Sequence, residues 1–322
     1  MKSFYHTRYR FYKPDQKEHT IFAISDIHFS DLTEDNLEQI AQKIEHVKPK
    51  IITVSGDLID SLESVDEPHE IARLKAWVTR IAKVAPVCLC LGNHDFYRQK
   101  EGFKSGLSKN RGYVAERNDN FIKAISEIDN VHYLDDASYE DDEFYVFGFT
   151  LPPVYYHFDY VTEKQGGIFH PGSEDVNILL EKLDESTEFT TKLPKKKTKI
   201  MLVHSPVHIT NEAVKEKLKE FDFVFAGHMH NGVVPPLLNE VWRGKSGILT
   251  PSKHIFVNHN TRTGLYDNQL IVLGAITTIQ KGAGALRALN RAFPVNYATI
   301  ETTKNETYAR KPDIRKKYEK WY

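Results

Sequence analysis

The chain has 322 residues, of which 40% are hydrophobic, and this is enough to bury a large core. The 43 lysine and arginine residues nearly balance the 44 acidic residues, so the net charge of −1 gives no general attraction to nucleic acid or to anionic membranes. Nucleic acid is therefore not expected as a partner, and any affinity for phosphate must be local. We expect one main domain.

The cysteines and the apolar segments bear on the compartment. Cys88 and Cys90 are two residues apart on one predicted strand, a spacing unsuited to a disulfide, and reduced buried thiols fit a reducing compartment. Residues 1–20 contain no apolar run of signal-peptide length, and the run Leu270–Ile279 is about half as long as a bilayer span. The sequence thus predicts a cytoplasmic protein with neither a secretion signal nor a transmembrane segment.

The first third of the chain predicts alternating strands and helices. Three short apolar runs are typical of buried strands: Thr20–Ser25, Ile51–Ser55 and Val87–Leu91. Between them, apolar residues recur at helical spacing in 37–47 and 68–81. Such a series predicts a parallel sheet buried on both faces, with ligands bound outside the carboxyl ends of its strands.

The alternation continues along the chain. Further helices are predicted around 121–128, 176–183 and 214–218, and further strands at Tyr145–Phe149, Lys199–Val203, Phe221–Ala226, Leu270–Ile279 and Tyr297–Thr302. Tyr5–Tyr12 alternates basic and aromatic residues, which favours a strand at a sheet edge over a nucleic-acid surface. We expect an N-terminal edge strand and extension over 1–19, the main domain over 20–303, and a polar C-terminal tail over 304–322.

Side chains that bind metals follow five of the predicted strands. They are Asp26 and His28, Asp57, Asn93 to Asp95, His204, and His228 with His230. Gly92-Asn93-His94-Asp95 and Gly227-His228-Met229-His230 are each improbable by chance, whereas Asp-x-His or Gly-Asp alone is a weak signal. Turn and cap roles would explain single aspartates such as Asp26 or Asp57, but they give no reason for histidines at four of the five strand ends.

In this order, D-x-H, G-D, G-N-H-D, H and G-H-x-H, the motifs resemble those of the calcineurin-like metallophosphoesterases, from about Phe22 to His230. The resemblance implies the metallophosphatase fold, an α/β protein in which two mixed β-sheets flanked by helices form a four-layer α/β/β/α sandwich. It also implies two divalent metal ions. Their implied ligands are Asp26, His28 and His230 for one ion, Asn93, His204 and His228 for the other, and Asp57 as the bridge.

The chemistry of this ligand set points the same way. Two ions that share a carboxylate and a hydroxide can clamp the attacking and leaving oxygens of an in-line displacement at phosphorus. Four imidazoles and an amide favour manganese, iron or zinc over magnesium or calcium, and manganese is our first expectation. The resemblance leaves His94 unligated and facing the substrate, where it can protonate the leaving oxygen. Asp95 is expected either to orient the His94 imidazole or to cap the turn.

Two departures from the family's pattern bear on the substrate. The G-N-H-D motif ends in Asp95 rather than glutamate and lacks the arginine-rich continuation of protein phosphatases, which argues against a phosphoprotein. The last motif continues as Asn231-Gly232-Val233 rather than with glycines and glutamine, so the substrate contacts of that loop differ. The favoured function is hydrolysis of a phosphodiester or a small phosphomonoester, as in the bacterial phosphohydrolases and phosphodiesterases that the arrangement resembles.

Two other functions stay open. One is a membrane-peripheral pyrophosphatase or phosphodiesterase acting on a lipid-linked head group, with Leu286, Leu289 and Phe293 as a small amphipathic contact, although ordinary core packing is favoured for them. The other is a non-catalytic scaffold on the same fold, which the complete motif set disfavours. Residues 237–259 mix aromatic, basic and apolar side chains, and they are expected either to line the substrate pocket or to form a surface loop.

Overall fold

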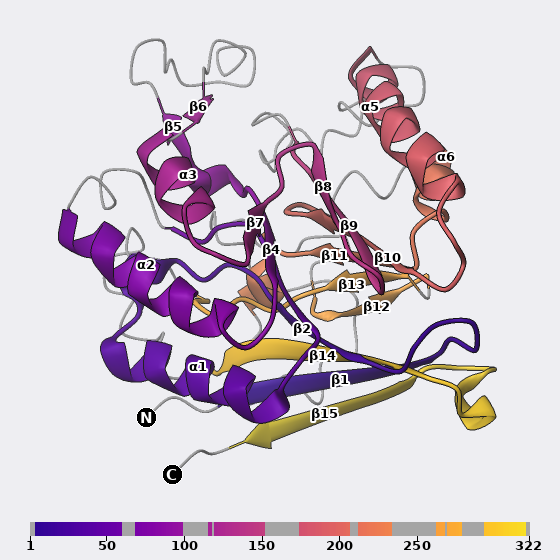
Figure 1. The fold of residues 1–322 in the computed structure, drawn as a ribbon, viewed down its shortest axis with the longest axis horizontal. Coiled ribbons are helices and arrows are strands. Elements are labelled where there is room, and N and C mark those ends of the chain that lie inside the picture. The colour runs from indigo at the N-terminus through magenta and orange to yellow at the C-terminus, as the bar shows by residue number, and fades with distance from the viewer. Residues whose placement is uncertain are drawn as a thin grey trace.

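The computed structural model describes residues 4–59, 68–98, 115–117, 119–151, 174–206, 212–233, 262–267, 269–278 and 293–319. Within these ranges the chain forms two mixed β-sheets that lie face to face, and helices cover both outer faces (Figure 1). This is the predicted four-layer α/β/β/α sandwich. A separate two-stranded ribbon pairs β5 (Phe96–Arg98) with β6 (Ala115–Arg117).

The first sheet has seven strands in the order β15-β1-β14-β2-β3-β4-β7. Their bounds are Asp313–Glu319 (β15), Phe4–Tyr12 (β1), Val295–Thr303 (β14), Thr20–Ile24 (β2), Ile51–Ser55 (β3), Val87–Cys90 (β4) and Val131–Tyr133 (β7). The strands β2, β3, β4 and β7 run parallel, as the alternating pattern predicts. The carboxyl ends of β2, β3 and β4 therefore meet at one edge of the sheet.

The two terminal segments differ from their predictions. β1 pairs in parallel with β14 and antiparallel with β15, so β1 is an interior strand and β15 forms the sheet edge. The expected polar tail is a strand because its backbone completes the ladder of β1, although most of its side chains are exposed. Lys43 and Tyr297 both bind the Glu319 carboxylate at the end of β15, which fixes this strand against the sheet.

The second sheet has six strands in the order β12-β13-β11-β10-β9-β8. Their bounds are Gly264–Tyr266 (β12), Leu270–Val272 (β13), Phe223–Ala226 (β11), Thr198–Val203 (β10), Phe144–Phe149 (β9) and Ala137–Glu140 (β8). The strand predicted over Leu270–Ile279 ends at Val272. The amides of Ile276 and Thr277 instead donate to the backbone carbonyls of Ser25 and Asp26, so the chain leaves this sheet and crosses to the end of β2.

The helices lie where the apolar spacing predicts them. The first sheet is covered by α1 (Glu34–Val47), α2 (Pro68–Ala82) and α3 (Asp119–Ser126), and the second by α5 (Glu174–Thr191) and α6 (Glu212–Leu218) (Figure 1). Thr33 caps α1 by accepting the Asn36 N–H, and the Trp77 indole N–H of α2 donates to the Leu37 carbonyl of α1. Among the described helices, none combines the length and the apolar character needed to cross a bilayer.

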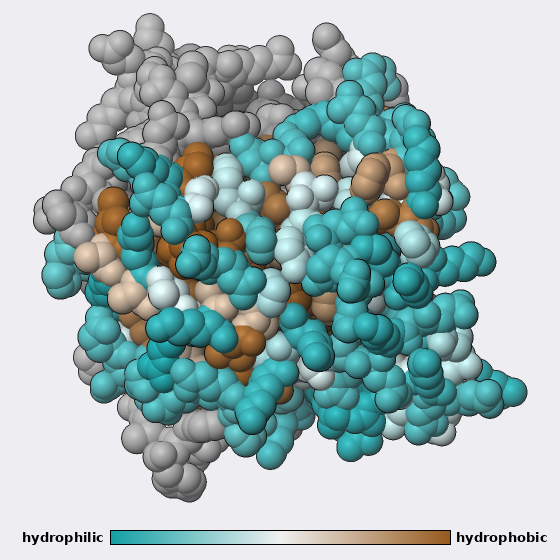
Figure 2. All heavy atoms as spheres, viewed as in Figure 1, coloured by the Kyte–Doolittle hydropathy of each residue, from teal (hydrophilic) through white to brown (hydrophobic). Residues whose placement is uncertain are grey.

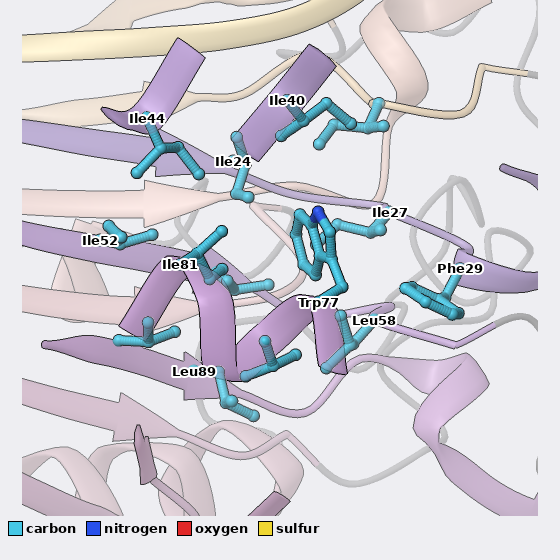
Figure 3. Packing of buried hydrophobic residues seen from close by; sticks show 14 of the residues in the cluster. Ile24, Ile27, Phe29, Ile40, Ile44, Ile52, Leu58, Trp77, Ile81 and Leu89 are labelled. Carbon is cyan, nitrogen blue, oxygen red and sulfur yellow. The ribbon is translucent and has the colours of Figure 1, made fainter. Parts of the chain in front are cut away.

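Buried side chains form three layers that match the sandwich. One cluster fills the space between the first sheet and its helices, including Trp77 of α2 (Figure 3), another lies between the second sheet and its helices, and a third lies between the sheets. Side chains alternate along a strand, so Phe22 faces the helices while Ile21 faces the second sheet. Cys88 and Cys90 lie in the layer between the sheets as free thiols, in agreement with the prediction.

The surface of the described residues is mostly polar. On the face shown in Figure 2, hydrophilic residues cover most of the right half, and hydrophobic residues show mainly to the left of the centre. Among the described large hydrophobic residues, Phe189, Ile314 and Tyr318 are more than a third exposed. The apolar side chains are therefore concentrated in the three interior layers.

Candidate metal centre

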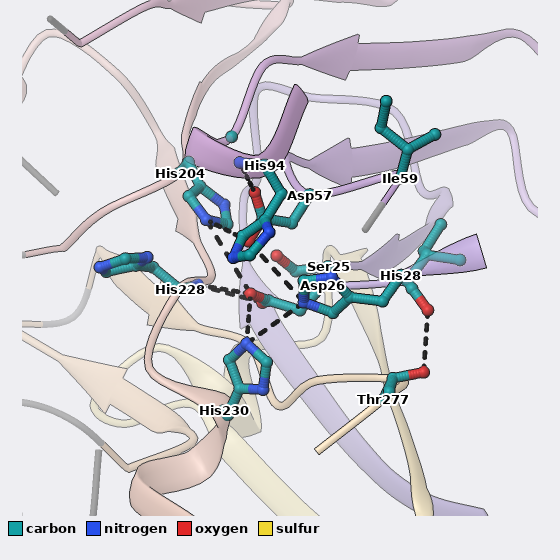
Figure 4. Close-up of polar contacts among 12 residues, drawn as sticks. Ser25, Asp26, His28, Asp57, Ile59, His94, His204, His228, His230 and Thr277 are labelled. Atoms are coloured by element: carbon teal, nitrogen blue, oxygen red, sulfur yellow. Dashed lines mark hydrogen bonds and ion pairs between the residues drawn. The ribbon is translucent and has the colours of Figure 1, made fainter. Parts of the chain in front are cut away.

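The nine residues predicted for the site all lie at the carboxyl ends of parallel strands, where the two sheets meet. Figure 4 shows the aspartates Asp26 and Asp57 together with the histidines of the site. Asp26 and His28 follow β2, Asp57 follows β3, Asn93 to Asp95 form a short 3-10 turn after β4, His204 follows β10, and His228 and His230 follow β11. Parallel strands end at one edge, which is why residues up to 204 positions apart converge here.

The aspartate and histidine side chains form two groups in which the potential ligand atoms lie within 4.8 Å of one another. The first group is Asp26, His28, Asp57 and His230, and the second is Asp57, His204 and His228. The Nε2 atom of His230 lies 3.1 Å from Asp26 Oδ1, and the Nε2 atom of His204 lies 3.1 Å from Asp57 Oδ2. Asp57 belongs to both groups, so its carboxylate is placed where it could bridge two neighbouring cations.

Backbone carbonyls orient two of the histidine rings. The Nδ1 atom of His204 lies 2.7 Å from the Ser55 carbonyl oxygen, and that of His230 lies 2.9 Å from the Thr278 carbonyl oxygen. We assign a proton to each Nδ1, which donates it to the carbonyl and leaves Nε2 as the ring nitrogen that faces the carboxylates. Metal-binding histidines use such contacts to fix their tautomer and ring orientation. Sequence reasoning missed both carbonyls, since a carbonyl carries no side-chain signal.

Asp26 joins the loops of the two sheets. Its carboxylate accepts the His228 backbone N–H at 3.1 and 3.0 Å, and its carbonyl accepts the Thr277 N–H. The Thr277 hydroxyl also donates to the Ile27 carbonyl at 2.9 Å (Figure 4). The loops after β2, β11 and β13 are therefore held together at the first group of potential metal ligands, which we call a donor group.

Asn93 and His94 lie beside these groups. The Oδ1 atom of Asn93 is buried and has no hydrogen-bond partner in the described part of the chain, a state that costs about 1–3 kcal/mol unless another group satisfies the oxygen. His94 belongs to neither donor group, and its backbone N–H donates to Asp57 Oδ1 at 2.9 Å. Its ring stands nearly perpendicular to that of His28, with 5.1 Å between the ring centroids.

Asp95 uses its carboxylate on the backbone. Its Oδ2 accepts the N–H groups of Gly92 and Asp57, and its Oδ1 accepts the N–H of Ile59. Burial and the Asp57 charge raise the pKa of Asp95 above its usual range, while the Gly92 and Ile59 N–H groups oppose this. Of the two alternatives predicted for Asp95, these contacts are those of a turn cap, because backbone donors take up both oxygens.

The backbone at the site is strained. Five of the ten described non-glycine residues with positive φ are candidate ligands: Asp26, His28, Asp57, His228 and His230, with φ between 45° and 67°. Non-glycine residues populate this left-handed region sparsely, and such strain clusters at functional sites. The concentration of strained residues at one place is therefore an independent sign of function.

Two motif glycines are required by close packing. A Cβ atom at Gly92 would collide with the carboxylate and backbone of Asp57, and one at Gly227 would collide with the side chains of Ser25 and Asp26. Any other residue at either place would push a candidate ligand aside. The glycines of these motifs thus belong to the site, although they carry no ligand atom.

The electrostatics of the site follow from burial and close pairing. Burial opposes ionisation of Asp26 and Asp57, yet the neighbouring histidines hold the pKa of each carboxyl below its usual range. Burial would lower the pKa of His204, but Asp57 and Asp26 raise it to about 9. Burial and the charge of His204 lower the pKa of His228 to about 3. The carboxylates are thus charged at neutral pH, and a proton on His204 competes with a cation for the same nitrogen.

A sandwich of two mixed sheets with paired donor groups at the strand ends is the architecture of metal-dependent phosphoesterases. Residues 19–232, which include every candidate ligand, match the family model described as calcineurin-like phosphoesterase. The match covers well over half of the chain, and the chain belongs to this family. The family assignment made from the motifs is confirmed.

Solved structures and curated sequences add little to this assignment. The similar structures include phosphopantetheinyl hydrolase from Mycobacterium tuberculosis (12% identity, TM-score 0.39, covering 80% of this chain and 89% of that chain) and a dimetal phosphatase from Danio rerio (13% identity, TM-score 0.37, covering 80% and 87%). No curated protein sequence matches the chain. Both TM-scores are below 0.5, so family membership rests on the family model.

Two segments with predicted roles lie outside the described residues. They are the segment 237–259, expected either to line the substrate pocket or to form a surface loop, and Leu286 and Leu289, considered for an amphipathic membrane contact or for core packing. Both therefore stay predictions.

Proposed function

We propose that this chain hydrolyses phosphodiesters or small phosphomonoesters with two divalent cations held by the two donor groups. The observation that carries the proposal is the Asp57 carboxylate, which is the single member common to both groups. The proposed ligands are Asp26, His28 and His230 for one cation, Asn93, His204 and His228 for the other, and Asp57 for both. Manganese is the first expectation, with iron and zinc as the alternatives.

Observations on individual donor atoms support this assignment. The Nε2 atoms of His204 and His230 face carboxylates because their Nδ1 atoms are used by carbonyls, and the buried Asn93 Oδ1 lacks a partner that a cation would provide. When bound, the two cations would neutralise the charge of the phosphoester and lower the pKa of an attacking water. The set of nitrogen and oxygen ligand atoms fits manganese, iron or zinc better than magnesium or calcium.

The chain's own groups position the reactants and move the proton. Asp26 and Asp57 place two negative charges in a buried setting, and these charges attract cations into the site. His94 stands outside both donor groups, with its backbone anchored to Asp57, and we propose that its imidazole donates a proton to the leaving oxygen. The sequence of the turn, which ends in Asp95 and lacks an arginine-rich continuation, supports a small or lipid-linked substrate rather than a phosphoprotein.

Two finer points belong to the proposal. The free thiols Cys88 and Cys90 support a reducing compartment, and we propose the cytoplasm. The lipid-linked alternative rests on residues around 286–293, and nothing in the described ranges favours it over a small substrate.

Metal analysis with a substrate panel tests the proposal. The purified protein should contain manganese, iron or zinc and should cleave an aryl phosphodiester or an aryl phosphomonoester, lose this activity on chelation, and regain it with Mn²⁺. Asp57→Asn should lose both bound metal and activity. Asp15→Asn, in the exposed turn between β1 and β2, is the matched control and should lose neither. A metal-replete wild type that is inactive on phosphodiester, phosphomonoester and pyrophosphate alike would favour the scaffold alternative.

A further inference from the structure

The Asp95 carboxylate ties together two loops of the site. It is 1% exposed and accepts three backbone N–H groups: Gly92 at 2.7 Å and Asp57 at 2.9 Å through Oδ2, and Ile59 at 3.1 Å through Oδ1. Gly92 belongs to the loop after β4, whereas Asp57 and Ile59 belong to the loop after β3. Both oxygens of this carboxylate therefore accept backbone N–H groups.

The contact between the loops runs in both directions. While Asp95 accepts the N–H of Asp57, the Oδ1 atom of Asp57 accepts the N–H of His94, at 2.9 Å. Each loop thus supplies a carboxylate that holds the backbone of the other. The remaining oxygen of Asp57, Oδ2, is the one that lies 3.1 Å from His204 Nε2.

We infer that Asp95 is a positioning residue that acts through Asp57, holding the shared carboxylate at the point where the two donor groups meet. The inference rests on the proposed metal centre and adds a residue that binds neither cation nor substrate. It replaces the idea of a direct partner for the His94 ring, because both Asp95 oxygens are used by the loop backbones.

The strain at Asp57 explains why an anchor is needed. Asp57 has a φ of 53°, a conformation that a non-glycine residue keeps only when its contacts hold it. Asp95 accepts the backbone N–H of Asp57, and Gly92 of the opposite loop packs against the Asp57 side chain and restricts its position. Without Asp95, the loop after β3 would relax toward common φ values and turn the shared carboxylate away from one of the donor groups.

The chemistry of the anchor requires a carboxylate. A carboxylate offers only acceptors, about four lone-pair sites in all, and can satisfy three N–H groups. In Asp95→Asn one oxygen becomes an NH₂ group that points donors at donors, so the backbone N–H groups of Ile59, or those of Gly92 and Asp57, lose their acceptor. Asp95→Ala removes all three acceptor contacts.

Mn²⁺ titration of the full chain by calorimetry, together with metal analysis, tests the inference. Asp95→Asn should bind Mn²⁺ about 10- to 100-fold more weakly than wild type, the usual loss for a group that orients a metal ligand, and Asp95→Ala should bind at least as weakly as Asp95→Asn. Asp141→Asn is the matched control. Asp141 also accepts two backbone N–H groups, those of Glu143 and Phe144 at 2.7 Å each, but in the hairpin between β8 and β9.

Three results would overturn the inference. The first is wild-type Mn²⁺ affinity in both Asp95 variants. The second is an equal loss of affinity in Asp141→Asn, which would make the effect a general consequence of lost turn contacts. The third is an altered pH profile of kcat/KM in Asp95→Asn with Mn²⁺ affinity unchanged, which would place the action of Asp95 on the His94 imidazole.

Hydrogen exchange of the wild type keeps the inference testable if neither variant folds. The amides of Gly92, Asp57 and Ile59 should exchange slowly, because each donates to the buried Asp95 carboxylate, and rapid exchange at all three would contradict the inference. These measurements involve no substrate. A protein whose Mn²⁺ affinity depends on Asp95 but that cleaves no phosphoester refutes the proposed function and leaves the inference standing. If the wild type binds no cation, the proposed function fails and amide exchange alone decides the inference.

Discussion

Replacing His19 with glutamine should make the protein less sensitive to mild acid. The His19 side chain is 7% exposed, its ring packs on Phe144 with 4.5 Å between centroids, and its Nε2 lies 3.2 Å from the Thr198 hydroxyl. Burial lowers the pKa of His19 from 6.5 to about 4, against the opposing charges of Glu143 and Asp141. In the folded protein the ring therefore stays neutral in mildly acidic solution.

The direction of the pKa shift gives the sign of the effect. An unfolded chain protonates this imidazole as the pH falls through about 6.5, and the folded protein only near pH 4, so unfolding takes up a proton in this window. The free energy of unfolding therefore falls as the pH is lowered. With a pKa of 6.5 in the unfolded chain and about 4 in the folded protein, the free energy of unfolding falls by about 2 kcal/mol between pH 7.5 and pH 5. Below pH 4 the total loss levels off near about 3 kcal/mol.

Urea unfolding of wild type and His19→Gln near pH 7.5 and near pH 5 measures this loss. Bound cations are first removed from both proteins with a chelator, so that cation binding does not contribute to the free energy of unfolding. Between the two pH values the free energy of unfolding of the wild type should fall by about 2 kcal/mol more than that of the variant. Burial also lowers the pKa values of His6 and His132, but these residues titrate in both proteins, so their contributions cancel. Equal losses in the two proteins would refute the reasoning.

Three further substitutions probe the site and the core. His94→Ala should lower turnover about 10²- to 10⁴-fold with metal content unchanged, and full activity would contradict its proposed role. Gly227→Ala should weaken Mn²⁺ binding in calorimetry, because the added Cβ collides with Ser25. Gly264→Ala is the control, since a Cβ at Gly264 meets nothing closer than 3.8 Å. Wild-type Mn²⁺ affinity in both variants would count against the packing at Gly227. Phe225→Ala should lower the free energy of unfolding by about 3–5 kcal/mol in urea, since the ring is fully buried between the sheets. A loss under about 1 kcal/mol would contradict that placement.

The alternating strands and helices could be read from the sequence because each buried strand is a short, nearly continuous apolar run. The strand predicted over Ile51–Ser55 has these bounds in the structure, and those after Thr20 and Val87 end within a residue of their predicted limits. The site residues followed from the same pattern, since parallel strands end at a common edge. Their convergence is observed, and their roles as ligands stay proposals.

The edge of the first sheet could not be read in this way. β15 has five exposed side chains between two partly buried ends, so its composition is that of a solvated tail. What makes it a strand is its backbone pairing with β1, which is set by a segment some 300 residues away. The same pairing moved β1 from the predicted edge into the interior.

The groups that orient the ligands were also hidden from the sequence. The Ser55 and Thr278 carbonyls belong to the backbone, and any residue type would supply them. Asp95 was visible as a carboxylate, and the sequence left open whether it orients the His94 imidazole or caps the turn. Only the fold shows that the amides of Gly92, Asp57 and Ile59 surround it.

The placement of β1 constrains the order in which the chain can fold. β1 precedes the other described strands, yet both of its partners, β14 and β15, come from residues 295–319 (Figure 1). During synthesis β1 and the β14 side of β2 must therefore wait with open hydrogen-bonding edges until residues 295–319 have emerged. Pairing over such sequence distances is slow, so this sheet closes late, and a ribosome-stalled chain ending before residue 295 would expose two strands ready to pair with other chains.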